Sequence, residues 1–169
     1  GGQVTAEVFD GNLTKLKGLL DPGRAVQFNA MFMDRYLWNL HFGTQRVVSK
    51  ARESGAPLDG VVISAGIPEP DEAPEVIGAL RNSGFSHIAL KPGTVAQIRA
   101  GLGIARQLEE TGTSIILQVE DGHAGGHHSW ENLDDLLTAT YAEIRRQPNV
   151  VLCVGGGIGT PERAADYLT

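Results

Sequence analysis

The segment VEDGHAGGHHSWENL, residues 119–133, places three histidines among glycines directly after a short apolar run. His123, His127 and His128 are all potential metal ligands. However, adjacent side chains of an extended chain point in opposite directions, and no carboxylate or cysteine pair completes a familiar zinc-ligand spacing. We therefore expect no metal in this segment.

The two glycines at 125 and 126 favour a different chemistry, in which the backbone comes close to a flat ligand because no side chain intervenes. An imidazole beside such a ligand can act as a general acid or base, since it titrates near neutral pH. We predict this role for His127, which directly follows the glycines. Alternation along the chain directs the His128 side chain away, so a structural role is favoured for His128.

Lys91 ends the apolar part of SHIALKPG and is followed by a proline, which cannot continue a strand. Three interpretations are open. Its ammonium faces a bound anion or a ring carbonyl, its amine forms a Schiff base after desolvation, or its stem lies along the surface of the protein. The first two make Lys91 a binding or catalytic residue.

The glycine-rich stretch VGGGIGTPER predicts a phosphate site, because its open backbone can direct N–H groups at an anion. Its glycines are Gly155, Gly156, Gly157 and Gly159. Thr160 can cap a helix that begins at Pro161. As a dinucleotide fingerprint the stretch is poor, because Thr160 occupies the place of the third glycine. A plain glycine-rich loop is the alternative.

These residues follow short runs rich in β-branched side chains, which predict buried parallel strands. The runs cover residues 25–32, 60–66, 86–93, 114–120 and 149–157. Stretches with helical spacing separate them, at residues 36–54, 73–83, 94–110 and 133–146, and further helices are expected within 3–20 and after Thr160. The β-α repeat predicts an α/β fold with a parallel sheet and right-handed crossovers.

All five strand ends carry polar or glycine residues, which is typical of a (β/α)8 barrel, where the active site lies at that face. The strand ends are Asn29, Ser64–Gly66, Lys91–Gly93, Asp121–Ser129 and Gly155–Thr160. A complete barrel needs roughly 250 residues, whereas this chain has 169. We therefore predict a partial TIM barrel of about five parallel strands, residues 1–169 forming part of one domain cut from a longer polypeptide.

Bulk properties limit the function classes. The chain is 41% hydrophobic with a formal net charge of −6, which gives no electrostatic footprint for nucleic acid or an anionic membrane. No apolar stretch approaches the roughly 20 residues of a membrane span. The single cysteine, Cys153, lies in the apolar run NVVLCV and is expected to be a small buried core residue. We expect a cytoplasmic protein.

The motifs AGGHHSWEN, ALKPGT and VGGGIGTPERAADYLT together resemble the enoyl reductase domain of type I fatty acid synthases, the multidomain enzymes of fungi and some bacteria. The likeness extends over the whole chain in the same order, with the bacterial branch the more similar. That family is similar in fold to nitronate monooxygenases, which are FMN-binding barrels. The resemblance implies that barrel strands one, two and eight lie outside this sequence.

The resemblance also implies a substrate and cofactors. FMN would lie across the barrel mouth with its phosphate on the glycines from Gly155 to Gly159. The implied contacts of the isoalloxazine and ribityl chain are Asn29, Gly66, Lys91, Gly125 and Gly126. NADPH would reduce the flavin, which would pass hydride to a trans-2-enoyl thioester on acyl carrier protein. His127 would supply the proton. The implied partners are the carrier and other synthase domains in a large homo-oligomer.

One departure and three alternatives accompany this resemblance. Gly122-His123 stands where the family often has Gly-Arg. A nitronate-oxidising barrel would share the FMN but use oxygen, and an aldolase would form a Schiff base on Lys91. A third alternative is a barrel retained only as a structural spacer in a megasynthase.

Overall fold

The computed structural model describes residues 4–125 and 129–168. In chain order its elements are α1 (Ala6–Leu19), β1 (Val26–Met31), α2 (Arg35–His41), α3 (Val47–Glu53), β2 (Leu58–Ser64), α4 (Ala73–Asn82), β3 (His87–Leu90), α5 (Val95–Leu108), the 3-10 turn η1 (Glu109–Thr111), β4 (Ile115–Glu120), α6 (Leu133–Arg145), β5 (Val150–Gly155) and α7 (Pro161–Ala165). The chain divides into two compact units, residues 1–89 and residues 90–169.

The five predicted strands are all present, and they are hydrogen-bonded in sequence order as one parallel sheet, β1-β2-β3-β4-β5. Within unit 1, β1 pairs with β2 and places Met31 opposite Ser64. Within unit 2, β4 pairs with β5 and places Glu120 opposite Gly155. The predicted α/β class and parallel pairing are therefore confirmed, and the closure of this sheet into part of a barrel stays a prediction.

Unit 1 is built around β2, almost all of whose side chains are buried. An aromatic cluster packs beside it through edge-to-face contacts, with ring centroids 5.7 to 6.0 Å apart. The cluster comprises Phe9, Phe28, Phe42 and Phe85. These side chains come from α1, β1 and the segments that follow α2 and α4, so the cluster ties the helices of this unit to the sheet.

The single helix expected over 36–54 is wrong, because the structure has two short helices there, α2 and α3. Gly43 turns so closely against α2 that a Cβ on it would lie 2.4 Å from Oδ1 of Asn39. Arg46 then adopts a left-handed backbone with φ of 56°. A residue in the left-handed conformation interrupts the series of helical hydrogen bonds. The apolar spacing of the sequence continues across this interruption, which is why it predicts a single helix.

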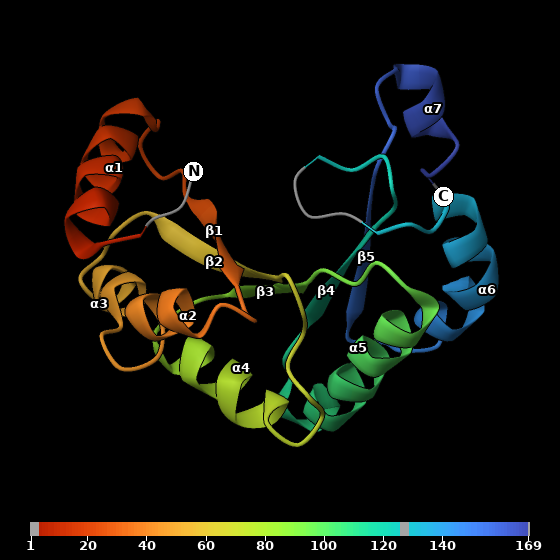
Figure 1. Cartoon of the computed structure of the whole chain (residues 1–169), viewed down its shortest axis with the longest axis horizontal. Helices are drawn as coiled ribbons and strands as arrows, with labels where there is room; N and C mark the ends of the chain where they lie inside the picture. Colours follow the sequence, from red (N-terminus) through yellow and green to blue (C-terminus); the bar gives the residue numbers. More distant parts are fainter. Residues whose placement is uncertain (1–3, 126–128, 169) are drawn as a thin grey trace. The chain divides into compact units, whose positions relative to one another are not determined.

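In unit 2, helices α5 and α6 contact each other and lie against β4 and β5 (Figure 1). The β4 side chains Ile115, Leu117 and Val119 are fully buried. Gly101 of α5 faces this layer, since a Cβ on it would come within 2.8 Å of Leu117. The alternate β4 side chains Gln118 and Glu120 point to the opposite face, and that face carries the candidate site.

The outer strand β5 is less buried than the inner strands, as expected for strands that lack a neighbour on one side. Its Val151 side chain is 55% exposed. Cys153 is also exposed, so the prediction of a buried core cysteine is wrong. The two residues lie on the same face of β5 by alternation, whereas Leu152 and Val154 line a cavity together with residues of α6.

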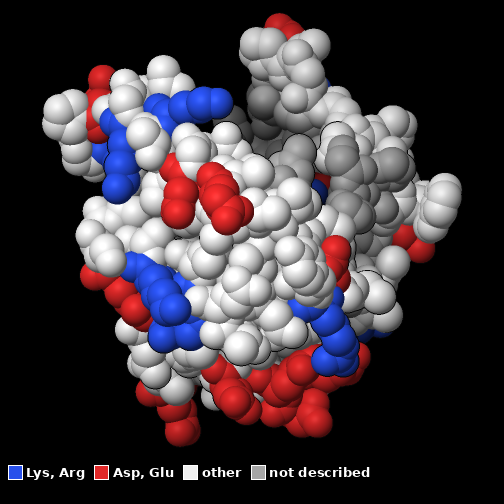
Figure 2. Space-filling view, turned by 60° about the vertical axis from the view of Figure 1, so that its left-hand side comes forward, with Lys and Arg blue, Asp and Glu red and all other residues white. Residues whose placement is uncertain are grey.

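The helix boundaries follow local capping chemistry. The Thr94 and Thr160 hydroxyls accept hydrogen bonds from Gln97 N and Arg163 N, and the Asn132 side chain accepts from the first turn of α6. The predicted Thr160 cap is thus confirmed. Figure 2 shows acidic and basic side chains on the face it presents, with many of the acidic ones gathered along its lower edge. Within residues 4–125 and 129–168, no helix is long and apolar enough to cross a membrane.

Candidate functional site

Lys91, the first residue after β3, forms a buried ion pair with Glu120, the last residue of β4. The Lys91 Nζ lies 2.7 Å from Glu120 Oε2, and the two side chains are only 11% and 10% exposed. Gln118, two residues earlier on the same face of β4, donates its Nε2–H to Glu120 Oε1 at 2.5 Å. The interpretation of Lys91 as an ordinary surface lysine is therefore wrong. Its ammonium is held at the carboxyl ends of the strands.

A second charged pair follows immediately along the chain. Asp121 is 4% exposed and accepts two hydrogen bonds from His123, from the backbone N to Oδ1 at 2.7 Å and from the ring Nδ1 to Oδ2 at 3.0 Å. Burial of the Asp121 carboxyl raises its pKa, but the hydrogen bonds from His123 and from the backbone of Leu133 outweigh burial and hold the pKa below its usual value.

The orientation of this imidazole follows from the ionisation of its partner. A carboxylate can only accept hydrogen bonds, so Nδ1 of His123 carries the proton that Asp121 accepts. The other ring nitrogen, Nε2, belongs to a side chain that is 72% exposed. The pair therefore presents Nε2 in a fixed orientation, where it is an acceptor in the neutral ring and a donor in the imidazolium.

The glycine loop after β5 packs directly against this pair. Gly156 has φ of +118°, and a Cβ on it would lie 1.8 Å from Asp121 Oδ1, so only glycine leaves room for the carboxylate. At Gly157, where φ is +62°, a Cβ would lie 3.5 Å from the Cβ of His123. Gly155 is the strand residue opposite Glu120. The predicted phosphate loop thus lies beside the Asp121–His123 pair.

The long loop after β4 is closed at its base. Ser129 Oγ donates to the carbonyl of Glu120 at 3.3 Å and accepts from Glu131 N at 3.1 Å. Gly122 N donates to the carbonyl of Glu131 at 3.1 Å. A Cβ on Gly93 would lie 2.7 Å from the Cβ of Ser129, so the loop base also packs on the segment after β3.

Three predicted residues of this loop, Gly126, His127 and His128, lie outside the described residues. Gly125 is described, and the position of a Cβ on it has no other group within 4 Å. The backbone at Gly125 is therefore open to close approach by a ligand, and its contact with a flavin stays a prediction.

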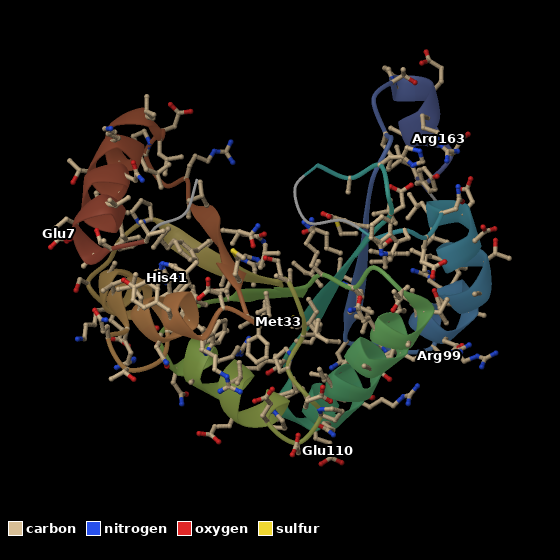
Figure 3. The ribbon with its side chains drawn as sticks, viewed as in Figure 1. Glu7, Met33, His41, Arg99, Glu110 and Arg163 are labelled. Atoms are coloured by element: carbon tan, nitrogen blue, oxygen red, sulfur yellow. The ribbon has the colours of Figure 1, made fainter. Side chains whose placement is uncertain are left out.

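The predicted residues of unit 1 form a neutral group. The buried Ser64 hydroxyl donates to Asn29 Oδ1 at 2.5 Å and also contacts the carbonyl of Ala30 at 3.1 Å. The chain then turns through left-handed conformations at Ala65 and Gly66. Gly66 has φ of +105° and lies against Met33, which follows β1 (Figure 3). Asn29 is exposed and lines a cavity of about 360 Å³ in this unit.

The structure therefore joins several predicted residues to partners that the sequence did not single out. Lys91 meets Glu120, and the glycine loop meets Asp121 and His123. Acidic residues at the end of an apolar strand, as in SIILQVED, are a signal that could have indicated Glu120 and Asp121. Across the described ranges, no group of three or more His, Cys, Asp or Glu side chains could hold a metal ion.

These residues fit a phosphate-bearing flavin. The backbone is open at Gly125 and Gly159, where an added Cβ would have no other group within 4 Å. Within unit 2, the Lys91 ammonium and the exposed imidazole of His123 supply polar groups that can bear charge. A flavin needs an open backbone, donors for its ring oxygens and an anion site for its phosphate.

A parallel sheet with charged groups and glycine loops at its strand ends is typical of ligand-binding α/β proteins. Comparison with known proteins is more specific. Residues 114–169, which include β4, α6, β5 and α7, match the family described as "Fatty acid synthase subunit beta/Fas1-like, helical".

Fungal fatty acid synthases are similar over most or all of the chain. The fatty acid synthase beta subunit aflB of Emericella nidulans is 36% identical over 171 residues that cover the whole chain. The fatty acid synthase subunit beta of Schizosaccharomyces pombe is 33% identical over the same span. Fatty acid synthase 2 of Mycosarcoma maydis is 36% identical over 141 residues, or 83% of the chain.

The chain spans only a small part of these relatives, 8% of the Emericella and Schizosaccharomyces proteins and 4% of the Mycosarcoma protein. It is therefore similar to one segment of fungal fatty acid synthases. This bears out the resemblance to fatty acid synthases. The enoyl reductase segment and the bacterial branch stay predictions.

Proposed function

We propose that this chain is part of an FMN- and NADPH-dependent enoyl-[acyl-carrier-protein] reductase in a fatty acid synthase. The observation that carries the proposal is the similarity of the whole chain to a segment of fatty acid synthase beta subunits. The charged and glycine-rich strand ends support it, because they offer the donors that a flavin phosphate and a polar ring require.

The residues proposed to hold FMN are divided between phosphate and ring. The glycines from Gly155 to Gly159 would take the phosphate. The proposed contacts of the isoalloxazine and ribityl chain are Asn29, Gly66, Lys91, Gly125 and Gly126. When bound, the flavin would supply hydride transfer from NADPH to the β-carbon of a trans-2-enoyl thioester on acyl carrier protein.

The residues of this chain would position the flavin ring and protonate the substrate. Glu120 and Gln118 fix the Lys91 ammonium, which can therefore donate to a ring carbonyl without first being ordered. A Schiff base on Lys91 would break its ion pair with the buried Glu120 carboxylate, so the structure does not favour the Schiff-base aldolase. His127 is proposed to donate the proton to the substrate α-carbon, where negative charge develops after hydride addition.

Kinetics of histidine variants in the intact protein test this assignment. General acid catalysis contributes about 10²- to 10⁴-fold, so His127→Ala should slow enoyl reduction by that factor while flavin content and flavin reduction by NADPH persist. His128→Ala is the matched control and should lower stability more than turnover. Stopped-flow enoyl reduction at the parent rate in His127→Ala, with His128→Ala impaired, would show that the two roles are reversed.

We also propose partners and a cellular location for this protein. The acyl carrier protein and the other synthase domains are the proposed partners, within a large homo-oligomer in the cytoplasm. Dependence of turnover on NADPH distinguishes this function from a nitronate-oxidising barrel, which would use oxygen. An intact protein without flavin absorbance would instead support a purely structural spacer.

A further inference from the structure

The Asp121–His123 pair in unit 2 is ordered by two hydrogen bonds. The buried Asp121 carboxylate accepts one from the backbone N–H and one from the ring Nδ1 of the same histidine. Such an arrangement fixes the imidazole plane and its tautomer, because both oxygens of Asp121 are engaged. Burying the carboxylate carries a desolvation cost, which these hydrogen bonds offset. The result is an exposed ring whose Nε2 is available in a defined orientation.

The backbone of the glycine loop after β5, at Gly156 and Gly157, packs against the Asp121–His123 pair. Gly156 leaves the space that the Asp121 carboxylate occupies, and Gly157 lies beside the Cβ of His123. An anion bound to the backbone of this loop beside Gly157 would therefore be next to the imidazole. An imidazolium that donates from Nε2 to such an anion forms a charge-assisted hydrogen bond, while Asp121 stabilises its positive charge.

A second carboxylate–histidine contact, in unit 1, differs in each of these respects. In unit 1, His87 Nδ1 lies 3.8 Å from Asp59 Oδ2, beyond hydrogen-bond range, and the side chains are 52% and 36% exposed. This pair lies at the amino-terminal parts of β3 and β2. It is a loose surface contact, so it serves as a matched control for the ordered pair at the glycine loop.

We propose that His123, positioned by Asp121, binds a phosphate monoester through Nε2 and so makes the site select phosphorylated over unphosphorylated ligand. The FMN phosphate is the proposed source, and this assignment rests on the proposed function. Neither the buried Asp121 nor Gly156 would contact the ligand through a side chain. Asp121 acts as a positioning residue, and the glycine permits its placement.

Flavin binding by the intact apoprotein tests the proposal through a ratio of affinities. FMN and riboflavin differ only in the phosphate, and their binding is followed by quenching of flavin fluorescence. His123→Ala should lower FMN affinity about 10- to 100-fold, as expected for a hydrogen bond to a charged group, and leave riboflavin affinity unchanged. His123→Gln should retain part of the preference, because its amide can still donate. The His87→Ala control should behave as the parent.

Asp121→Asn tests the positioning role. It should reduce the FMN preference while riboflavin binding, as a measure of folding, persists. An unchanged FMN-to-riboflavin ratio in His123→Ala, or an equal loss of both ligands, would overturn the proposal. Loss of the NADPH preference over NADH instead would overturn the flavin as the source of the phosphate and assign the site to the nucleotide.

Inorganic phosphate separates this proposal from the proposed function. Its phosphorus-31 signal should broaden with the parent protein and broaden less with His123→Ala. If the parent binds no flavin but shows this His123-dependent broadening, the reductase assignment fails and the phosphate site stands. If His123→Ala changes neither the broadening nor the FMN preference, the phosphate site is wrong whether or not the protein binds flavin.

Discussion

The strand ends of the two units differ in charge. In unit 1, the carboxyl ends of β1 and β2 carry the Asn29 amide and the Ser64 hydroxyl, joined by one hydrogen bond. In unit 2, the ends of β3 and β4 carry the Lys91–Glu120 ion pair and the Asp121–His123 pair. The same position in a β-α repeat therefore serves neutral hydrogen bonding in one unit and fixed charge in the other.

The difference indicates that the two units supply different kinds of chemical group. The Asn29 amide and the Ser64 hydroxyl are uncharged and do not titrate near neutral pH, whereas the Lys91 and His123 side chains can carry positive charge. We therefore expect the proton-transfer and anion-binding chemistry of the proposed reductase to come from unit 2. Variants at corresponding positions of the two units test this difference.

The largest effect on stability is expected at the buried ion pair. Lys91→Met leaves the Glu120 carboxylate buried beside an apolar side chain, and loss of one partner of a buried pair costs about 3–5 kcal/mol. Denaturant unfolding of the intact protein measures this cost. The double variant Lys91→Met/Glu120→Gln should recover part of it, because no unpaired charge remains. A single variant as stable as the parent would show that the pair is not buried in solution.

A smaller effect is expected from the left-handed glycines, one in each unit. Gly66→Ala and Gly156→Ala both force a side chain into a backbone conformation that costs about 1–3 kcal/mol. Gly66 has the flexible and exposed Met33 as its neighbour, which can move aside, whereas Gly156 has the buried Asp121 carboxylate. Gly156→Ala should therefore be the more destabilising in thermal unfolding. Equal losses of thermal stability in the two variants would mean that the Asp121 carboxylate does not lie against Gly156.

Acid stability should report the Asp121–His123 pair. Because the folded-state pKa of Asp121 lies below its usual value, its ionised form contributes stability above the unfolded pKa of about 3.9, and that contribution disappears as the pH falls through the folded value. The stability difference between the parent and Asp121→Asn should therefore shrink below about pH 4. A difference that does not change with pH would contradict the hydrogen-bonded carboxylate.

The smallest effect is expected at an exposed ion pair of unit 2. Arg99 on α5 donates to Glu143 of α6 at 2.7 Å, and Figure 3 shows the Arg99 side chain on the outer side of α5. Solvent screens such a pair, so Arg99→Ala should leave the unfolding midpoint nearly unchanged. A loss as large as that of Lys91→Met would show that burial does not distinguish the two pairs.

Much of the fold could be predicted from local pattern. The β-branched runs and the spacing of the helices place all five strands within a few residues of their observed ends. The break between α2 and α3 could not, because it depends on Gly43 packing on Asn39 and on the left-handed backbone of Arg46. Cys153 was also misjudged, since an apolar run does not tell an outer strand from an inner one.

The candidate site was predicted in part. Lys91 and the glycines were indicated by their positions after strands, whereas their partners Glu120 and Asp121 were not. Those pairings depend on the register between neighbouring strands and loops, which places residues about 30 positions apart in contact. His123 was present in the motif, but only the hydrogen bonds to Asp121 distinguish it as an oriented group.

The visible spectrum of the intact protein under anaerobic conditions tests the proposed enoyl reductase most directly. We expect flavin absorbance that NADPH bleaches and that a trans-2-enoyl thioester then restores, with release of the saturated thioester. Absence of flavin, or a reduced flavin that the enoyl thioester cannot reoxidise, would contradict it.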